Sequence, residues 1–120
     1  MKHVLVVDDD VAVRDMLCAA LTAAGYQTAV AGNGKEALAQ LRSGSTLPGL
    51  ILLDMMMPEM TGWEFRAAQQ ADPVLAAIPV AIITVLANSD PKLADLRAVD
   101  VLAKPSRIEM LLAVVDRLCR

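Results

Sequence analysis

The chain has 120 residues, a net charge of −3, and a composition that is 56% hydrophobic and only 2% aromatic. This length fits a single domain over residues 1–120 with an aliphatic core. The sequence holds no cluster of lysine and arginine, no apolar run long enough for a membrane span and no signal peptide, so we expect a cytoplasmic protein that binds neither nucleic acid nor membranes.

Short apolar segments alternate with helical patterns along the chain. The apolar segments have four or five residues, which indicates strands buried on both faces, as in a parallel sheet. One strand followed by one helix, five times over, is typical of a doubly wound α/β fold with helices on both faces of the sheet. In chain order, the sequence predicts a strand at His3–Val7, a helix at Val11–Ala24, a strand at Gln27–Val30, a helix at Lys35–Arg42, a strand at Leu50–Leu53, a helix at Trp63–Gln70, a strand at Val80–Thr84, a short helix at Pro91–Arg97, a weaker strand at Val99–Ala103 and a helix at Arg107–Leu118.

The first and last predicted helices have the clearest patterns. Asp10 precedes the first helix and can cap its amino terminus, and Gly25 follows it as a carboxyl-terminal cap. The last helix carries apolar residues at the i, i+3, i+4 and i+7 positions of one face, namely Ile108, Leu111, Leu112 and Val115. We expect this face to pack against the sheet.

Polar side chains stand at the carboxyl ends of four predicted strands. Because the carboxyl ends of parallel strands lie at one edge of a sheet, we expect these side chains to converge. Clustered carboxylates repel one another, and a divalent cation with oxygen ligands relieves that repulsion, which favours Mg²⁺ with Mn²⁺ as a plausible alternative. A cation, an ammonium and a hydroxyl around one carboxylate suit phosphoryl transfer to that carboxylate. The residues are Asp8, Asp9, Asp10, Asp54, Thr84 and Lys104.

Each of these residues alone has a simpler interpretation. Asp10 by itself is more often a helix cap than a metal ligand. A threonine at a strand end usually has no special role, and Lys104 could be a solvated loop lysine. The coincidence of four strand ends, each with the residue type that this chemistry needs, favours the site.

Over its whole length the sequence resembles the receiver domains of response regulators. The resemblance rests on the run from Val4 to Asp10, on Thr84, on Lys104-Pro105, and on the run from Leu53 to Gly62, which contains the pattern Asp-x-x-Met-Pro-x-Met-x-Gly. It implies a flavodoxin-like sheet of five parallel strands in the order 2-1-3-4-5. It also implies a phosphoacceptor in two-component signal transduction, which is not a turnover enzyme.

The resemblance assigns a role to each site residue. Asp54 matches the aspartate that accepts a phosphoryl group from a histidine kinase or a phosphotransfer protein. Lys104 matches the lysine that contacts the phosphoryl oxygens, and Thr84 matches the switch hydroxyl that moves to bind them. A downstream protein, which the sequence does not identify, recognises the changed conformation. The Mg²⁺ ligands implied by the resemblance are Asp8, Asp9, Asp54 and the backbone carbonyl of Met56.

Three departures from the family pattern affect the switch rather than the chemistry. Val101 stands three residues before the lysine, where the family usually has an aromatic residue, so the usual aromatic switch is absent or replaced. Val85 follows Thr84 where alanine or glycine is usual, and its branched side chain should narrow access to the site. The stretch from Thr84 to Lys104 is short, so we expect an altered output face.

The lifetime of the phosphoryl group is a separate hypothesis. Met56 and Leu86 occupy positions that flank the phosphoryl group in the family. Both side chains are apolar and cannot orient an attacking water. The sequence therefore predicts a long-lived phosphoaspartate.

Three other functions are alternatives to the phosphoacceptor. A pseudo-receiver would keep the fold and dock partners without phosphate, which the complete set of site residues disfavours. A Mg²⁺-dependent phosphatase needs a second aspartate two residues after its nucleophile, where Met56 stands. An FMN carrier needs a hydroxyl- and glycine-rich loop after the first strand, which is missing. Because the sequence stops after the last helix, it is either a single-domain regulator or a piece of a longer protein.

The sulfur-containing residues have structural interpretations. Cys18 and Cys119 fall on the first and last predicted helices, and we expect reduced thiols in a cytoplasmic protein. A disulfide between them, which would require those two helices to touch, is the less favoured alternative. The run Met55–Met57 with Met60 could suggest a soft-metal site, but packing of the loop against Trp63 is the favoured interpretation.

Overall fold

The computed structural model describes residues 3–44, 47–55, 57, 59–84, 100–103 and 108–119. Five parallel strands form one sheet in the order β2-β1-β3-β4-β5. The strands are β1 (His3–Val7), β2 (Gln27–Ala31), β3 (Leu50–Leu53), β4 (Val80–Thr84) and β5 (Asp100–Ala103). The helices are α1 (Val11–Ala23), α2 (Gly34–Ser43), α3 (Gly62–Ala71), α4 (Pro73–Ala76) and α5 (Ile108–Leu118).

The predicted elements agree closely with the observed ones. All five strands and four of the helices are present, with bounds within one residue of the prediction. The predicted short helix Pro91–Arg97 lies outside the described residues. One helix was not predicted: Asp72 accepts hydrogen bonds from the backbone N–H groups of Val74 and Leu75, and Pro73 occupies the first turn, so a short helix forms directly before β4.

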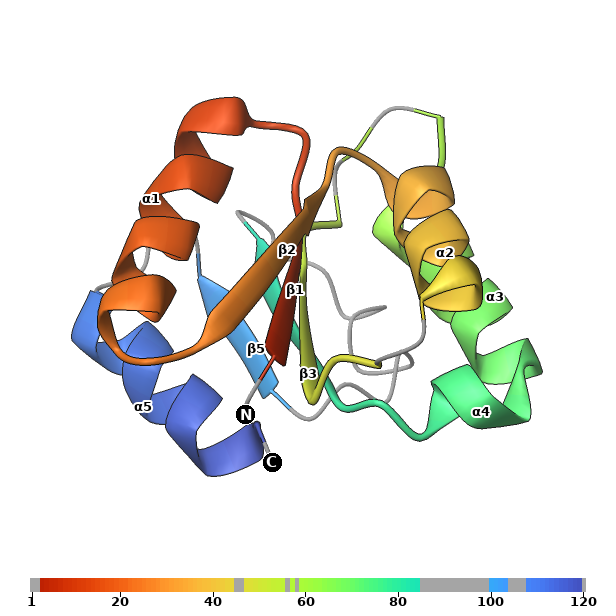
Figure 1. Ribbon diagram of the computed structural model, residues 1–120. Coiled ribbons are helices and arrows are strands. Elements are labelled where there is room, and N and C mark those ends of the chain that lie inside the picture. Colours follow the sequence, from red (N-terminus) through yellow and green to blue (C-terminus); the bar gives the residue numbers. More distant parts are fainter. Residues whose placement is uncertain are drawn as a thin grey trace.

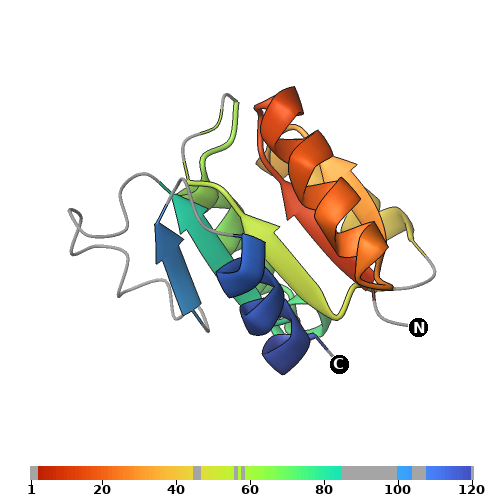
Figure 2. The ribbon, with the colours of Figure 1, turned by 90° about the vertical axis from the view of Figure 1, so that its left-hand side faces the viewer.

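The helices cover both faces of the sheet (Figure 1). Helices α1 and α5 lie side by side on one face, which Figure 2 shows from that side, and α2 and α3 lie on the other. Successive residues of a strand point to opposite faces, so Val4 and Val6 join the core under α1 and α5 while Leu5 and Val7 join the core under α2 and α3. This alternation explains why the central strands are continuously apolar.

The last helix is buried along a slightly different face from the predicted one. Leu111 and Val115 are buried as expected, but Val114 is also buried, whereas Ile108 and Leu112 are only half-buried. The i, i+3, i+4 pattern therefore begins at Leu111 rather than at Ile108.

The sulfur-containing residues pack as expected. Met55 and Met57 are buried in the core under α2 and α3, and Met60 and Trp63 pack against that core, which confirms the packing interpretation for these residues. Cys18 and Cys119 are free thiols, and the buried Cys119 thiol donates to the His3 carbonyl oxygen at 3.4 Å. Among the described helices, none combines the length and apolar character that crossing a membrane requires.

A buried polar group ties α3 to the segment that follows it. Gln69, which is fully buried, donates its side-chain N–H groups to the carbonyl oxygens of Leu75 at 2.8 Å and Ile78 at 3.1 Å. Its carbonyl oxygen accepts a hydrogen bond from the buried Arg66 guanidinium at 2.7 Å. Burial also lowers the pKa of Arg66 from its usual range.

Replacing Gln69 by leucine is therefore expected to lower the free energy of unfolding by about 2–3 kcal/mol, because buried partners lose their hydrogen bonds. Urea unfolding measures the change. The matched control is Gln70→Leu at the neighbouring exposed position of the same helix, where we expect a change within about 0.5 kcal/mol. Equal effects at the two positions would show that the buried hydrogen bonds contribute little.

The single tyrosine joins the start of β2 to α5. The Tyr26 hydroxyl donates to Asp116 Oδ1 at 3.3 Å, and the ring is buried. Burial, and then the negative charge of Asp116, raise the pKa of Tyr26 above its ordinary value of 10.0. Because folding raises this pKa, the stability gained from the neutral phenol is complete below pH 10.0 and is lost as the pH rises through the raised pKa.

Alkaline titration tests this shift directly, because phenolate absorbance reports a single tyrosine in this chain. We expect the folded protein to titrate at a higher pH than the urea-unfolded chain. Asp116→Asn should lower the folded midpoint without removing the whole shift, since burial remains. A folded midpoint at or below the unfolded one would contradict this assignment.

Candidate functional site

The site lies at the edge of the sheet where the central strands end. Asp8 follows β1, Asp54 follows β3 and Thr84 is the last residue of β4. The pairing of Val7 with Leu53 places the first two of these residues at the same level on neighbouring strands. The sheet topology therefore converges residues that are far apart in the sequence, as predicted.

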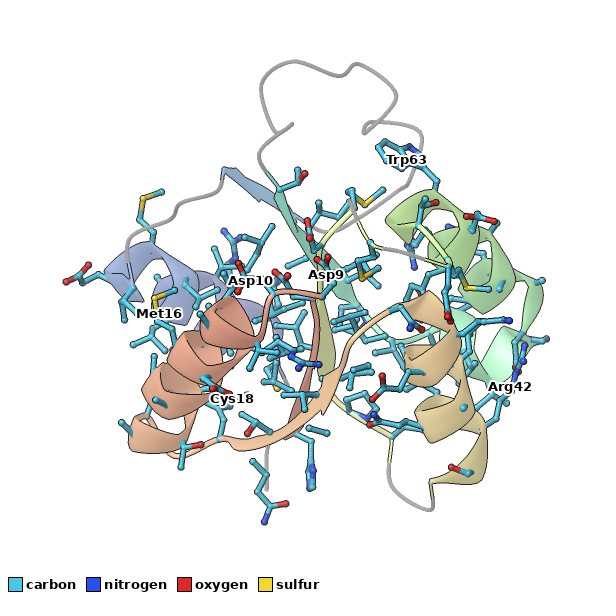
Figure 3. The ribbon with its side chains drawn as sticks, turned by 90° about the horizontal axis from the view of Figure 1, so that it is seen from above. Asp9, Asp10, Met16, Cys18, Arg42 and Trp63 are labelled. Carbon is cyan, nitrogen blue, oxygen red and sulfur yellow. The ribbon has the colours of Figure 1, made fainter. Side chains whose placement is uncertain are left out.

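Three carboxylates meet at this edge. Asp8, Asp9 and Asp54 each present one oxygen atom, and these oxygens all lie within 4.8 Å of one another. Asp8 is 3% exposed and Asp54 is 6% exposed, whereas Asp9 is exposed at the rim. Figure 3 looks down on this edge and shows Asp9 above the strand ends. Three oxygen donors in this space form a donor set that suits a hard divalent cation such as Mg²⁺.

Backbone hydrogen bonds hold the two buried aspartates. The Asp8 N–H donates to the Ala31 carbonyl oxygen at 3.0 Å, and the Asp54 N–H donates to the Val7 carbonyl oxygen at 2.9 Å. Both bonds continue the sheet ladder one residue beyond the strands. The carboxylates are therefore attached to backbone that is as well fixed as the sheet itself.

Two backbone hydrogen bonds, one to α3 and one to α2, hold the loop after Asp54. The Gly62 N–H donates to the Met55 carbonyl oxygen at 3.1 Å, and the Gly34 N–H donates to the Met60 carbonyl oxygen at 3.4 Å. Glu59 in this loop adopts a φ of 65°, in the left-handed region that few non-glycine residues occupy. The loop is thus held between α3 and the first residue of α2.

A capping box completes the end of this loop. The Glu64 N–H donates to Thr61 Oγ1 at 3.3 Å, and the Thr61 N–H donates to Glu64 Oε1 at 3.0 Å, so both ends of the box are closed at the start of α3. The role of Gly34 in holding this loop does not follow from the sequence. Its position after Asn33, a good helix cap, marks a helix start, but no local pattern indicates the contact with Met60.

Of the remaining predicted residues, the structure describes Thr84 and Val101. Thr84 is fully buried at the end of β4, where its backbone pairs with Ala103, the last residue of β5. Val101 lies in β5, opposite Ile82. Some residues of the site, the family motifs, the switch and the lifetime hypothesis lie outside the described residues, namely Met56, Pro58, Val85, Leu86, Lys104 and Pro105.

The sequence matches the response regulator receiver domain family over residues 4–116. The chain belongs to this family. The predicted family is thereby confirmed, and so is the flavodoxin-like fold. The match also favours a signalling domain over the phosphatase and the FMN carrier considered above.

Curated relatives of this receiver domain are longer proteins. It is 40% identical over 120 residues to the response regulator PleD of Caulobacter vibrioides, an alignment covering 98% of this chain and 26% of PleD. It is 38% identical over 125 residues to the DNA-binding dual master transcriptional regulator RpaA of a Synechocystis strain, covering 100% of this chain and 50% of RpaA. The chain thus spans half or less of these relatives.

Solved receiver domains have the same fold. The signal receiver domain of a signal transduction histidine kinase from Syntrophus aciditrophicus has a TM-score of 0.89 and 34% identity, covering 98% of this chain and 89% of that one. The response regulator TrrA of Thermotoga maritima, crystallised in complex with Mg²⁺ and BeF, has a TM-score of 0.86 and 29% identity, covering 98% and 99% of the two chains.

Proposed function

We propose that residues 1–120 form one receiver domain that takes a phosphoryl group on Asp54 in a Mg²⁺-dependent reaction. The observation that carries this proposal is the convergence of oxygen atoms from Asp8, Asp9 and Asp54 within 4.8 Å. Membership of the receiver family supports it independently. The structure of TrrA in complex with Mg²⁺ and BeF is a precedent for the ligand chemistry in a protein of the same fold.

Asp54 is the best placed of the three aspartates to act as the acceptor. Asp9 lies on the exposed rim, whereas Asp8 and Asp54 are buried, and Asp8 Oδ1 accepts a hydrogen bond from the Asp10 N–H at 2.9 Å. Asp54 lies at the end of the central strand β3, and the loop held by the Gly62 and Gly34 N–H groups follows it directly. A buried, well-positioned carboxylate needs little reorganisation before it attacks phosphorus.

The proposed reaction forms one bond and breaks one. A carboxylate oxygen of Asp54 attacks the phosphorus of a phosphohistidine, and the bond between phosphorus and the histidine nitrogen breaks. Asp8, Asp9, Asp54 and the Met56 carbonyl would hold Mg²⁺, which neutralises charge on the phosphoryl oxygens when bound. Lys104 would contact the same oxygens, and Thr84 would supply the hydroxyl that hydrogen-bonds them after transfer.

We propose a histidine kinase or a phosphotransfer protein as the phosphodonor, in the cytoplasm, and a downstream protein as the partner that recognises the phosphorylated form. The domain keeps the phosphoryl group until it is hydrolysed, so it acts as a stoichiometric acceptor rather than as a turnover enzyme. The added group carries nearly two negative charges. We expect these charges to shift the strand ends from their unphosphorylated conformation to a second one.

Acetyl phosphate and intact-mass spectrometry test the metal requirement. We expect one phosphate per chain when Mg²⁺ is present and background incorporation when a chelator replaces it. Asp9→Asn should reduce incorporation at limiting Mg²⁺, because it removes the exposed ligand. An equal yield with chelator would show that the carboxylate cluster does not act through a metal. A complete lack of adduct would instead favour a docking module that works without phosphate.

A further inference from the structure

The three consecutive aspartates after β1 look equivalent in the sequence, but the structure separates them. Asp8 and Asp9 belong to the carboxylate cluster with Asp54, whereas Asp10 does not. Figure 3 shows Asp10 beside the first turn of α1, displaced from Asp9 above the strand ends. The third aspartate therefore has a separate role.

The side chain of Asp10 is engaged with the start of α1. Asp10 Oδ1 accepts hydrogen bonds from the Ala12 N–H at 3.0 Å and the Val13 N–H at 3.3 Å. Its backbone carbonyl oxygen accepts the first helical hydrogen bond, from the Arg14 N–H at 3.0 Å. This confirms the predicted helix cap and fixes the backbone of Asp10 to the helix.

The backbone of the same residue holds a carboxylate of the cluster. The Asp10 N–H donates to Asp8 Oδ1 at 2.9 Å, across the turn between β1 and α1. One oxygen of Asp8 is thereby fixed in direction by a donor that the cap in turn keeps in place. Hydrogen bonds of this kind, behind the atoms that contact a metal, set the orientation of carboxylate ligands.

We propose that Asp10 is a positioning residue for the cation site: its capping side chain fixes the N–H that orients the Asp8 carboxylate. The inference rests on the proposed function, since it treats Asp8 as part of a Mg²⁺ site. The capping hydrogen bonds, and not the negative charge of Asp10, carry the effect. Asparagine and serine also cap helices well, so they should replace aspartate here, whereas alanine should not.

Mg²⁺ titrations test the proposal in the variants Asp10→Ala, Asp10→Asn and Asp10→Ser. Backbone amide NMR signals monitor the binding at a temperature below the melting temperature of each variant. We expect Asp10→Ala to weaken Mg²⁺ binding by about tenfold. The asparagine and serine variants should bind close to the wild-type value. Asp15→Ala is the matched control, because it removes an exposed negative charge from the same helix and leaves the cap intact.

The possible outcomes separate this inference from the proposed function. Equal losses in all three Asp10 variants would mean that the charge acts, and wild-type affinity in Asp10→Ala would mean that the cap has no influence; either result overturns the inference alone. A wild-type protein whose signals do not respond to Mg²⁺ at Asp8, Asp9 and Asp54 would overturn the proposed metal site, and this inference with it.

Discussion

Replacing Asp54 by asparagine is expected to abolish phosphoryl incorporation and, at the same time, to stabilise the metal-free fold. The first effect follows because an amide is not the nucleophile that a carboxylate is. The second follows because Asp8 and Asp54 are both buried in one carboxylate cluster. Removing one of these charges relieves repulsion, by roughly 1 kcal/mol once solvent screening is allowed for.

Two measurements check this pair of effects. Intact-mass spectrometry after acetyl phosphate treatment gives the incorporation, and urea unfolding without Mg²⁺ gives the stability. Asp15→Asn, at an exposed position on α1, is the control and should change neither quantity. A variant at Asp54 that still gains one phosphate would show that another residue is the acceptor. A less stable variant would show that the buried carboxylates are not in net repulsion.

Gly62→Ala is expected to lower the free energy of unfolding by about 2–3 kcal/mol, although glycine to alanine in a helix normally stabilises. A Cβ atom at this position would lie 2.5 Å from Met55 Sδ, 2.8 Å from Met55 Cα and 3.0 Å from the Asp54 carbonyl oxygen. Two of these atoms are backbone, so the loop after Asp54 must move. We therefore also expect weaker Mg²⁺ binding.

Gly34→Ala is the matched comparison, because Gly34 is likewise the first residue of its helix. A Cβ atom there would meet Met60 Cγ at 2.7 Å, Met60 Sδ at 2.8 Å and Phe65 Cβ at 3.0 Å. A methionine side chain can move more easily than backbone, so we expect a smaller loss of about 1 kcal/mol, partly recovered with Met60→Ala. Equal losses at Gly62 and Gly34, or a neutral Gly62→Ala, would contradict this explanation.

Much of the fold follows from the sequence because the strands are so clearly marked. Val4–Val7 and Leu50–Leu53 are short and continuously apolar, as expected of strands that are buried on both faces, and the structure buries all eight residues. Once the strands are placed, parallel topology puts Asp8, Asp9 and Asp54 at one edge, and the structure brings their oxygens together. The candidate site was predictable because it depends on strand ends, which local sequence fixes.

Other features depend on contacts that local sequence does not specify. Gln69 resembles an ordinary polar helix residue, yet it is buried against the segment after α3. The contact between Gly34 and Met60 joins the start of α2 to the loop before α3, which is distant in the sequence. The short helix at Pro73–Ala76 was marked by Asp72 and Pro73, but the apolar run that follows concealed it. These features can be identified only from the tertiary structure.

Locating the phosphoryl group tests directly whether Asp54 is the acceptor. The protein is treated with acetyl phosphate and Mg²⁺, the acyl phosphate is reduced with borohydride, and the modified position is found by peptide mass spectrometry. We expect modification at Asp54 in nearly all of the labelled protein. Modification at Asp8, Asp9 or any other residue, or labelling that does not depend on Mg²⁺, would contradict it.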